Sequence, residues 1–476
     1  MRVAYISLFR RGRGGGEGRV ANELASRFAE RHEVVMICPA VETGLRHDED
    51  GALKVFGVRS AGEGEFHMPV LSAKAVRAVF DFLDEFNPHV VHAHEPALLG
   101  LIGQVWAKMH LVPFVHTSHI LPASVLDFGA VDALDMRVLQ GSFGESISRR
   151  LLTDFYENCD AIVALNQPAL TALREFGYDG RVFVIPNGRD LERYAQCGDT
   201  DVTTAQKTLT FVGYMSERKN QHYLLEVHRL LPEPYRLLLI GKALKPEYGK
   251  LLRSYCEAYG LDNVVFVGQV PHEEIPGYLE KTHVFVSASK MEVQSLVVIE
   301  ALASGTPLIG LANETTSELV DDQVGCCLPR DAAPEEFAVC VERVCALPPE
   351  EYQQLCKNAR ERVSHLDWSN VVDQTVAAYR ELINERPPVR TKRGAVLDDL
   401  ISFLPSGEVK EIFRERVRVS RSRPGPIAEL TGELSLGQKW RALKRVEGST
   451  WLLAGGTVLV SLVSYLFMRR RAGDDE

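Results

Sequence analysis

Short β-branched segments alternate with helical segments through the first 385 residues of this 476-residue chain. The short segments have the length and composition of buried strands, and the segments between them carry apolar residues at helical spacing. This alternation is typical of parallel sheets that have helices on both faces. The expected strands form two sets, which lie at residues 3–7, 34–38, 90–92, 114–116, 161–164 and 182–185, and at residues 209–212, 237–240, 264–267, 284–287 and 308–309.

The main helical segments expected between these strands lie at residues 19–31, 98–109, 149–156, 224–231, 248–259 and 296–304. Each set of strands is sufficient for a complete open sheet. The turn Pro186-Asn187-Gly188 and the polar residues 196–207 mark the join between the two sets. We therefore predict an α/β fold of two doubly wound, Rossmann-like domains that face a cleft, at residues 1–190 and 205–368.

Two carboxylates eight residues apart are the strongest functional signal. Glu292 precedes an apolar helical run that we expect to start near Ser295, and Glu300 lies more than one turn inside that run. The N-terminus of a helix offers unpaired N–H groups and the positive end of the helix dipole, which together attract anions. Two glutamates at this spacing also occur on ordinary surface helices. Beside an anion site, however, they suit a ligand with both hydroxyl groups and phosphates, such as a nucleotide sugar.

A glycine-rich segment, residues 10–17, directly follows the first expected strand. Glycine allows the backbone to approach a phosphate closely, and the helix that follows supplies further N–H groups. The segment matches neither the dinucleotide-binding pattern G-x-G-x-x-G nor the P-loop pattern. Its three arginines either raise the local affinity for anions or only solvate a flexible turn.

Histidines lie at the ends of two expected strands of the first set. His92 and His94 end one strand, and His116 and His119 end the next. Ligands of open α/β sheets bind at the carboxyl ends of the strands, so we expect these imidazoles to line the cleft. The string His-x-His-Glu at residue 92 is also compatible with metal binding, but no third ligand matches it, and we predict no metal site.

The segment from Ser289 to Pro307, which contains both glutamates, resembles the Glu-x7-Glu motif of retaining glycosyltransferases of family 4, which have the GT-B fold. Segments elsewhere resemble that family too: the glycine pair, the His-Thr-Ser-His119 turn, the Pro-Asn-Gly-x-Asp turn and the segment at residues 213–219. Many members have Gly-Phe-Gly after the first glutamate, where this chain has Val293-Gln294-Ser295. Its form Ser-Lys-x-Glu-x-Gln is similar to that of glycolipid-making members.

The resemblance implies a role for each matching residue. Glu300 should hold the ribose of the donor, Glu292 should lie beside the transferred sugar, and His119 should approach the reacting carbon. Lys219, Arg218 and the backbone amides of Gly15 and Gly16 should bind the diphosphate. Tyr214 stands where the family has an arginine, so either Arg218 compensates or the phosphate chemistry differs. Further donor contacts are expected at Gly213, Gln294, Ser295 and Leu296, and no metal or other cofactor is implied.

Charge is distributed unevenly along the chain. Residues 1–385 carry a net charge of −16, whereas residues 386–450 carry 14 Lys and Arg against 8 Asp and Glu. An acidic body argues against nucleic acid as the main partner, and a basic segment suits an anionic lipid surface. Residues 451–468 are uncharged and apolar, which is near the lower limit for a helix that spans a membrane. We expect a basic juxtamembrane linker followed by a transmembrane or membrane-anchoring helix.

These observations together predict a hexosyltransferase (EC 2.4.1-type) that moves a hexose from UDP-glucose or a similar donor to a membrane lipid such as diacylglycerol. The alternatives are a glycosyltransferase for a polyprenyl-linked envelope glycan and a non-catalytic membrane protein that binds sugar nucleotides. Scattered cysteines without a C-x-x-C pair favour a reducing compartment, so we expect cytosolic catalytic domains at a membrane. The resemblance also implies that a helix at residues 369–385 returns to brace the first domain.

Overall fold

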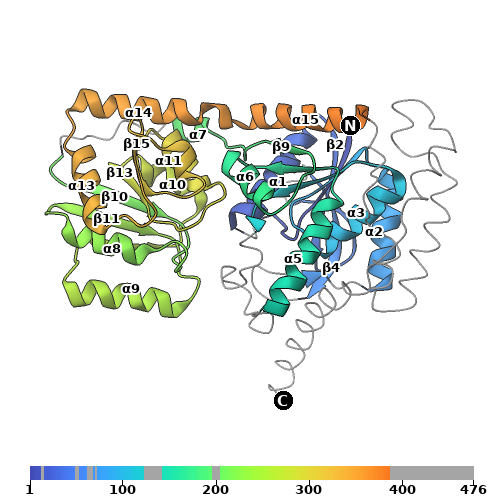
Figure 1. The fold of residues 1–476 in the computed structure, drawn as a ribbon, viewed down its shortest axis with the longest axis horizontal. Coiled ribbons are helices and arrows are strands. Elements are labelled where there is room, and N and C mark those ends of the chain that lie inside the picture. The colour runs from blue at the N-terminus through green and yellow to red at the C-terminus, as the bar shows by residue number, and fades with distance from the viewer. Residues whose placement is uncertain are drawn as a thin grey trace, which may run out of the picture.

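The computed structural model describes residues 1–11, 15–48, 53–61, 68–69, 72–122, 142–195 and 204–385. These residues form two α/β halves, each built on its own sheet, and helices α14 (Pro349–Val363) and α15 (Trp368–Asn384) run along one side of both (Figure 1). The predicted α/β fold with two Rossmann-like sheets is confirmed. The predicted linker at residues 386–450 and the membrane helix at 451–468 lie outside the described residues.

The first sheet has the strand order β3-β4-β2-β1-β6-β7-β8-β9 in the described part of the chain, and β5 pairs with β4. Its pairs are parallel except those that β3 and β5 make with β4. The strands are β1 (Arg2–Ile6), β2 (Glu33–Ala40), β3 (Gly44–His47), β4 (Lys54–Ala61), β5 (Met68–Pro69), β6 (Val90–Ala93), β7 (Phe114–Ser118), β8 (Ala161–Ala164) and β9 (Val182–Val184).

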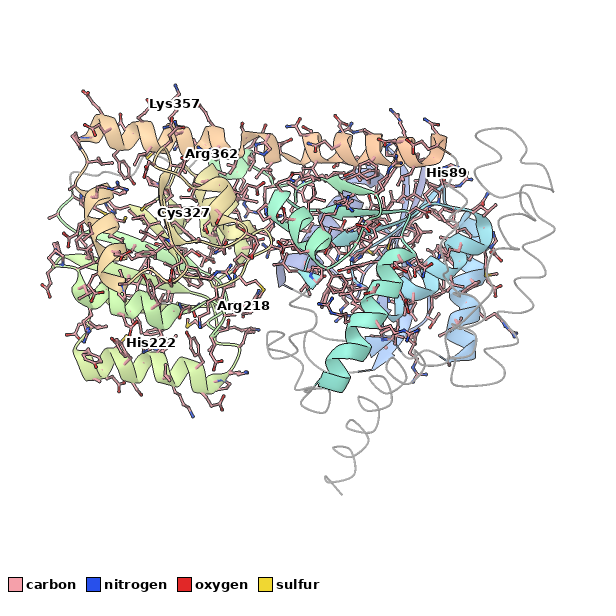
Figure 2. All side chains as sticks on the ribbon, viewed as in Figure 1. His89, Arg218, His222, Cys327, Lys357 and Arg362 are labelled. Atoms are coloured by element: carbon pink, nitrogen blue, oxygen red, sulfur yellow. The ribbon has the colours of Figure 1, made fainter. Side chains whose placement is uncertain are left out.

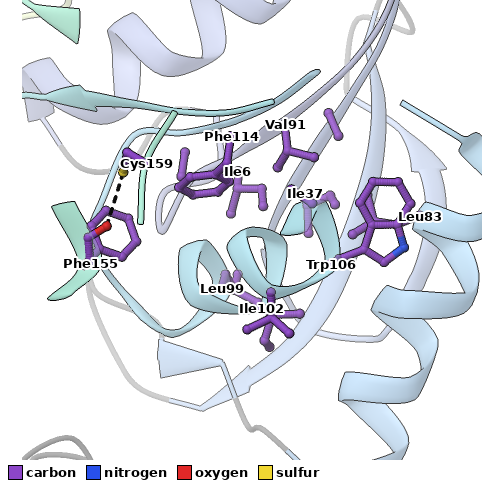
Figure 3. Close-up of a cluster of buried hydrophobic side chains, with 14 of the residues drawn as sticks. Ile6, Ile37, Leu83, Val91, Leu99, Ile102, Trp106, Phe114, Phe155 and Cys159 are labelled. Carbon is purple, nitrogen blue, oxygen red and sulfur yellow. Dashed lines mark hydrogen bonds between the residues drawn. The ribbon is translucent and has the colours of Figure 1, made fainter. Parts of the chain in front are cut away.

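The first sheet is covered on both faces, as parallel sheets require. Its helices are α1 (Gly15–Ala29), α2 (Ala73–Phe86), α3 (Leu98–His110), α5 (Ser142–Glu157) and α6 (Gln167–Glu175). On one face Trp106 of α3 and Phe155 of α5 pack with Ile6, Val91 and strand residues around them (Figure 3). On the opposite face the core includes residues of α1 and α15, and Tyr379 of α15 is fully buried there.

The second sheet is entirely parallel in the described residues, with the order β12-β11-β10-β13-β14-β15. Its strands are β10 (Lys207–Val212), β11 (Tyr235–Ile240), β12 (Val264–Gly268), β13 (Val284–Ser287), β14 (Leu308–Leu311) and β15 (Gly325–Leu328). Its helical segments are α8 (Gln221–Leu230), α9 (Pro246–Tyr259), η2 (His272–Glu274), α10 (Ile275–Leu279), α11 (Leu296–Ala303), α12 (Thr316–Leu319) and α13 (Pro334–Cys345), and α7 (Glu192–Ala195) lies between the sheets in the chain.

The start of the first helix differs from the sequence prediction. We expected a helix from residue 19, but α1 already begins at Gly15, so Gly15 and Gly16 form its first turn rather than a loop. Helix ends with a weak apolar pattern are difficult to place from sequence. The glycine amides therefore belong to a helix N-terminus, where the first N–H groups have no partner within the helix.

Helices α2 and α6 begin at capping residues. The side chain of Ser72 accepts a hydrogen bond from the Ala75 N–H at the start of α2, and that of Asn166 accepts one from Ala169 before α6. No helix within the described ranges is long and apolar enough to cross a membrane.

Candidate active site

Two helix N-termini meet between the halves of the molecule. A Cβ atom added to Gly16 in the first turn of α1 would lie 2.9 Å from Leu296 Cδ1, and Leu296 is the first residue of α11. Only glycine allows this approach without a shift of the leucine side chain. The adjoining Ser295 N–H donates to Thr315 Oγ1 at 2.8 Å, which fixes the start of α11. Two positive helix ends therefore lie close together, and each favours a bound anion.

The loop that carries Glu292 is held from both sides. The Glu292 N–H donates to Glu314 Oε2 at 3.1 Å, and the Glu292 carbonyl accepts from Thr315 Oγ1 at 3.0 Å. From the first half, Asn166 Nδ2 donates to the Val293 carbonyl at 2.6 Å. Glu292 is a buried residue, 9% exposed, and these hydrogen bonds fix the backbone on either side of it.

Lys219 forms an ion pair with Glu292 through its Nζ atom. The aliphatic part of the Lys219 side chain passes over Gly213. The Lys219 Cε atom lies 4.0 Å from the position that a Cβ atom on Gly213 would occupy. Gly213 has a φ of 148°, a conformation that favours glycine. Asn220, which follows the lysine, has a left-handed backbone at φ 55°. The structure thus brings together Gly213, Lys219 and Glu292, three of the residues expected to contact the donor.

Arg218 lies on the side of the second half that faces the first half (Figure 2). Its carbonyl accepts a hydrogen bond from the Lys290 N–H at 2.9 Å, which ties its loop to the loop of Glu292. Its Nε is buried and has no hydrogen-bond partner among the described residues. A buried guanidinium nitrogen without a partner is available to an anionic ligand.

Tyr214 occupies the position at which the family has an arginine. Lys242, which follows β11, lies over its ring, with Nζ 5.7 Å from the ring centroid. The Tyr214 carbonyl accepts from Gln221 Nε2 at 2.9 Å. The Lys242 ammonium group therefore lies beside Tyr214, the residue that stands where the family has an arginine.

Glu300 is buried in α11 at 1% exposure and contacts an imidazole and a guanidinium of other segments. His272 Nε2 lies 2.9 Å and Arg189 Nε 3.4 Å from Glu300 Oε1. Burial by itself raises the pKa of Glu300, but the His272 hydrogen bond and the Arg189 charge outweigh burial and hold it below its usual value. Oε2 is buried and has no hydrogen-bond partner in the described part of the chain. The carboxylate is thus ionised and has one oxygen that can accept a ligand hydroxyl.

Gln294 joins the two halves. Its Oε1 accepts from the Asn187 N–H at 2.7 Å, and its Nε2 donates to the Leu165 carbonyl at 3.2 Å. Both ends of the amide are therefore engaged with the backbone of the first half, whereas we had expected this residue to contact the donor.

The four histidines converge at the carboxyl ends of β6 and β7. His94 Nδ1 and His119 Nε2 are 2.8 Å apart, and the two rings stack. His92 contacts Thr117 Oγ1 at 2.7 Å and the Tyr379 hydroxyl, and His116 Nδ1 contacts the Ala93 carbonyl at 3.0 Å. His92, His94 and the half-buried His119 line a small cavity together with hinge residues Asn187 and Gly188. The described residues contain no cluster of three or more His, Cys, Asp and Glu side chains that could hold a metal.

Burial makes these imidazoles neutral. It lowers the pKa of His116 to about 4 and lowers those of His92, His94 and His119 as well, with the neighbouring histidines adding to the effect. Each folded-state pKa lies below the unfolded value of 6.5, so below pH 6.5 the unfolded chain binds more protons than the folded chain. The free energy of unfolding should therefore fall as pH drops from 6.5, by about 1.4 kcal/mol per pH unit for each histidine.

Urea unfolding at pH 7.5 and pH 5.5 measures this dependence. His116→Gln should reduce the change of the unfolding free energy with pH by the contribution of one histidine. His47→Gln, at an exposed position, should leave that pH dependence unchanged. Equal unfolding free energies of the wild-type chain at the two pH values would contradict the account.

Glu95 was not predicted as a site residue. It follows β6 by two residues, and it accepts hydrogen bonds from the Leu8 N–H at 2.8 Å and the Ser7 hydroxyl at 3.0 Å. Burial nevertheless raises its pKa to about 8, and burial together with the Glu95 charge raises the pKa of Glu17 in α1. Near pH 7 the Glu95 carboxyl group is therefore largely protonated. The string His-Ala-His-Glu was visible in the sequence, but the hydrogen bonds to Ser7 and Leu8 were not.

Two family models match this chain. The model for Glycosyltransferase Family 4 matches residues 14–193, and the model for glycosyl transferases group 1 matches residues 199–362. Together they cover more than two thirds of the chain. The first match includes the first sheet except β1, and the second match includes the whole second sheet.

Curated relatives are distant. The chain is 24% identical over 253 residues to the alpha-monoglucosyldiacylglycerol synthase of Streptococcus pneumoniae, which covers 50% of this chain and 55% of that protein. It is 26% identical over 317 residues to the D-inositol 3-phosphate glycosyltransferase of Corynebacterium urealyticum, covering 62% and 71%. The chain thus spans about half the length of the first relative.

Solved structures share the fold. Sucrose-phosphate synthase from Thermosynechococcus elongatus is 21% identical with a TM-score of 0.65, and the match covers 81% of this chain and all of that chain. HepE of Anabaena in complex with UDP-glucose is 18% identical with a TM-score of 0.62, covering 80% and 100%. The two family matches and this fold agree, and the chain belongs to the family 4 (group 1) glycosyltransferases of the GT-B fold.

Proposed function

We propose that this protein transfers a hexose from UDP-glucose or a similar UDP-sugar to the hydroxyl of a membrane lipid such as diacylglycerol, with retention of the anomeric configuration. The observation that carries the proposal is the convergence at the N-terminus of α11. There Gly16 of the first half approaches Leu296, Lys219 pairs with Glu292, and Glu300 keeps one oxygen without a partner.

The donor fits the second half in two parts. The ionised Glu300 accepts hydrogen bonds from the ribose hydroxyls through Oε2. The diphosphate lies against the N–H groups of Gly15, Gly16 and Leu296 and against the side chains of Lys219 and Arg218. Gly213 and Ser295 allow the backbone to approach closely, and Gln294 holds the loop of Glu292 against the hinge.

Replacement of Glu300 by Gln should weaken binding of UDP by about 10- to 100-fold, since a hydrogen bond to a charged group contributes about 1.5–3 kcal/mol. Titration calorimetry of the full chain with UDP measures the change. Glu318→Gln, a change of an exposed glutamate on the nearby α12, is the matched control. Equal UDP affinities of the Glu300 variant and the wild type would show that the ribose does not bind at Glu300.

The chemistry follows from the charges that face the donor. The bond between the anomeric carbon and the phosphate oxygen breaks, and Lys219 and Arg218 stabilise the negative charge that builds on the leaving diphosphate. Glu292 steadies the positive charge that develops on the sugar ring, and the neutral His119 approaches its hydroxyl groups. The acceptor hydroxyl attacks from the same face and gives its proton to the departing phosphate.

Retention has a direct test. The product of an α-linked UDP-hexose should carry an α-glycosidic bond, which the anomeric proton coupling in its NMR spectrum reports. A β-linked product would contradict the proposed mechanism while leaving the donor site intact.

A lipid acceptor is supported by three observations. One relative is named as a diacylglycerol-sugar synthase, residues 386–450 are basic, and residues 451–468 are apolar and uncharged. We propose that residues 1–190, braced by α15, form the acceptor-side domain and residues 205–368 the nucleotide-sugar domain. The linker and the helix at 451–468 would then hold cytosolic catalytic domains on an anionic membrane surface.

Two alternatives are favoured by specific observations. Other relatives are named as D-inositol 3-phosphate glycosyltransferases, so acceptors differ among similar chains, and a polyprenyl-linked glycan is the second candidate acceptor. Tyr214 replaces an arginine of the family, which is compatible with a membrane protein that binds sugar nucleotides without catalysis. Slow hydrolysis of UDP-hexose by the purified chain separates an enzyme from such a binder.

A further inference from the structure

A buried guanidinium lies at the junction of the two halves. Arg189 follows the Pro-Asn-Gly turn and is 3% exposed. Its Nε lies 3.4 Å from Glu300 Oε1 on α11, and its Nη1 lies 3.3 Å from Glu23 Oε2 on α1. One side chain therefore connects the candidate ribose carboxylate of the second half with the first helix of the first half.

The backbone of Arg189 is fixed as well. Its N–H donates to the Leu366 carbonyl at 2.8 Å, and its carbonyl accepts from the Trp368 N–H at 3.3 Å. A Cβ atom on the preceding Gly188 would lie 2.2 Å from Trp368 Cε3. The chain passes between the halves near Arg189 and again near Trp368, and these hydrogen bonds join the two connecting segments. The backbone that carries the guanidinium is therefore fixed.

The charge balance around Glu300 depends on this guanidinium. Besides Arg189, the carboxylate contacts the half-buried His272 and the hydroxyl of the buried Tyr194. Burial raises the pKa of Glu300, and the His272 hydrogen bond and the Arg189 charge oppose it, so loss of the arginine should raise that pKa. A protonated carboxyl is a weaker acceptor of hydroxyl hydrogen bonds than a carboxylate.

We propose that Arg189 is a positioning residue that keeps Glu300 ionised, directs its Oε2 toward the donor ribose and ties that carboxylate to α1 through Glu23. The proposal rests on the proposed function, since it presumes that Glu300 binds the ribose. Its Nη2 and Nε have no hydrogen-bond partner among the described residues, so the contact with Glu300 at 3.4 Å is an ion pair.

UDP binding across pH tests the proposal on the full chain. Arg189→Gln should weaken binding about tenfold at pH 8 through the loss of orientation, and the loss relative to the wild type should grow as pH falls toward 6. Arg189→Lys keeps a cation and should restore most of the affinity. The double variant with Glu300→Gln removes both buried charges and leaves only the partly exposed Glu23 without its partner, so it should fold and bind UDP no more weakly than Glu300→Gln alone.

The matched control is Arg181→Gln, which removes an arginine that pairs with Glu381 and Glu385 of α15 away from the site. It should bind UDP as the wild type does at every pH. If Glu300→Gln binds UDP normally, the ribose role in the proposed function fails. Suppose instead that Glu300→Gln weakens UDP binding. The positioning role is overturned if Arg189→Gln then leaves binding unchanged. It is also overturned if Arg189→Gln weakens binding by the same factor at every pH and its effect adds to that of Glu300→Gln in the double variant.

A second, independent observation concerns two thiols in the second half. Cys326 Sγ on β15 and Cys340 Sγ on α13 are 2.7 Å apart, and a disulfide bond is about 2.05 Å long. Cys326 is buried and Cys340 is half-buried, so a small oxidant reaches Cys340 first. Burial raises the pKa of Cys326 to about 12, which makes it the second of the two to react.

We propose that Cys326 and Cys340 form a reversible disulfide with a small disulfide oxidant such as oxidised glutathione. The Cys340 thiolate attacks one sulfur of the oxidant and releases one glutathione. The Cys326 thiol then attacks the mixed disulfide, loses its proton and releases the second glutathione. Two protein thiols are oxidised, and one oxidised glutathione is reduced to two glutathione molecules.

Intact mass and maleimide labelling of the full chain after treatment with oxidised glutathione test this bond. The expected result is the protection of two thiols without added glutathione mass, reversed by dithiothreitol. Cys326→Ser and Cys340→Ser should each abolish the protection, and Cys345→Ser, on the same helix, should not. Retention of glutathione on the wild-type chain, or labelling of all nine cysteines, would overturn the proposal.

Discussion

Glu292→Gln is expected to lower the kcat of sugar transfer by about 100- to 1,000-fold, which is typical for the loss of one electrostatic group at a reacting centre. The amide keeps the size of the side chain and its fixed turn, but it cannot balance the positive charge that develops on the sugar. Binding of UDP should change by less than about threefold, because this carboxylate faces the sugar and not the nucleotide.

Initial rates with saturating donor and calorimetry with UDP separate the two effects. Glu217→Gln, an exposed glutamate near Lys219 in sequence, is the control and should transfer sugar at the wild-type rate. A Glu292→Gln enzyme with an unchanged kcat would mean that this carboxylate does not face the reacting sugar.

Lys219→Met is expected to lower kcat/KM by about 100- to 1,000-fold, because the lysine charge stabilises the leaving diphosphate. The variant also leaves the Glu292 carboxylate without the ion pair that the structure shows. Lys219→Arg keeps the charge and should recover part of the loss. Steady-state kinetics on the three proteins measure this order.

Lys290→Met removes a second lysine of the same region, but one whose side chain is exposed, and its kcat/KM should remain within about twofold of the wild type as for most surface substitutions. Similar losses of kcat/KM in Lys219→Met and Lys290→Met would show that the loss comes from a general change in surface charge. The diphosphate would then have to be placed elsewhere.

Most of the parallel strands could be predicted from the sequence, but β3, β4, β5 and β15 were missed. The buried parts of β10, β11 and β13 read Leu-Thr-Phe-Val, Leu-Leu-Leu-Ile and Val-Phe-Val-Ser, which are mostly apolar, as expected of a parallel sheet covered on both faces. Strand β3 is mostly exposed, and β15 reads Gly-Cys-Cys-Leu without a β-branched residue, so neither has that pattern. Local pattern identifies a strand only where burial selects its residues.

The residues of the donor site could be predicted, but their pairing could not. Glu292, Glu300 and Lys219 were identified by their flanking segments. The contacts of Glu300 with Arg189 and His272 join three separate segments, and they arise only when the chain crosses between the halves. The same holds for Gln294, whose partners are backbone groups at Leu165 and Asn187. Contacts of this kind depend on tertiary packing and leave no local pattern.

Transfer of label from radioactive UDP-glucose, or another UDP-hexose, to lipid tests the central claim most directly. The purified full chain is incubated with vesicles that contain or lack diacylglycerol, and the lipids are extracted into organic solvent. The account predicts that label enters the organic phase only when diacylglycerol is present, and that Glu292→Gln prevents it. Absence of label from the organic phase with both diacylglycerol and polyprenyl phosphate vesicles, together with an intact donor in the aqueous phase, would contradict the assignment as a lipid glycosyltransferase.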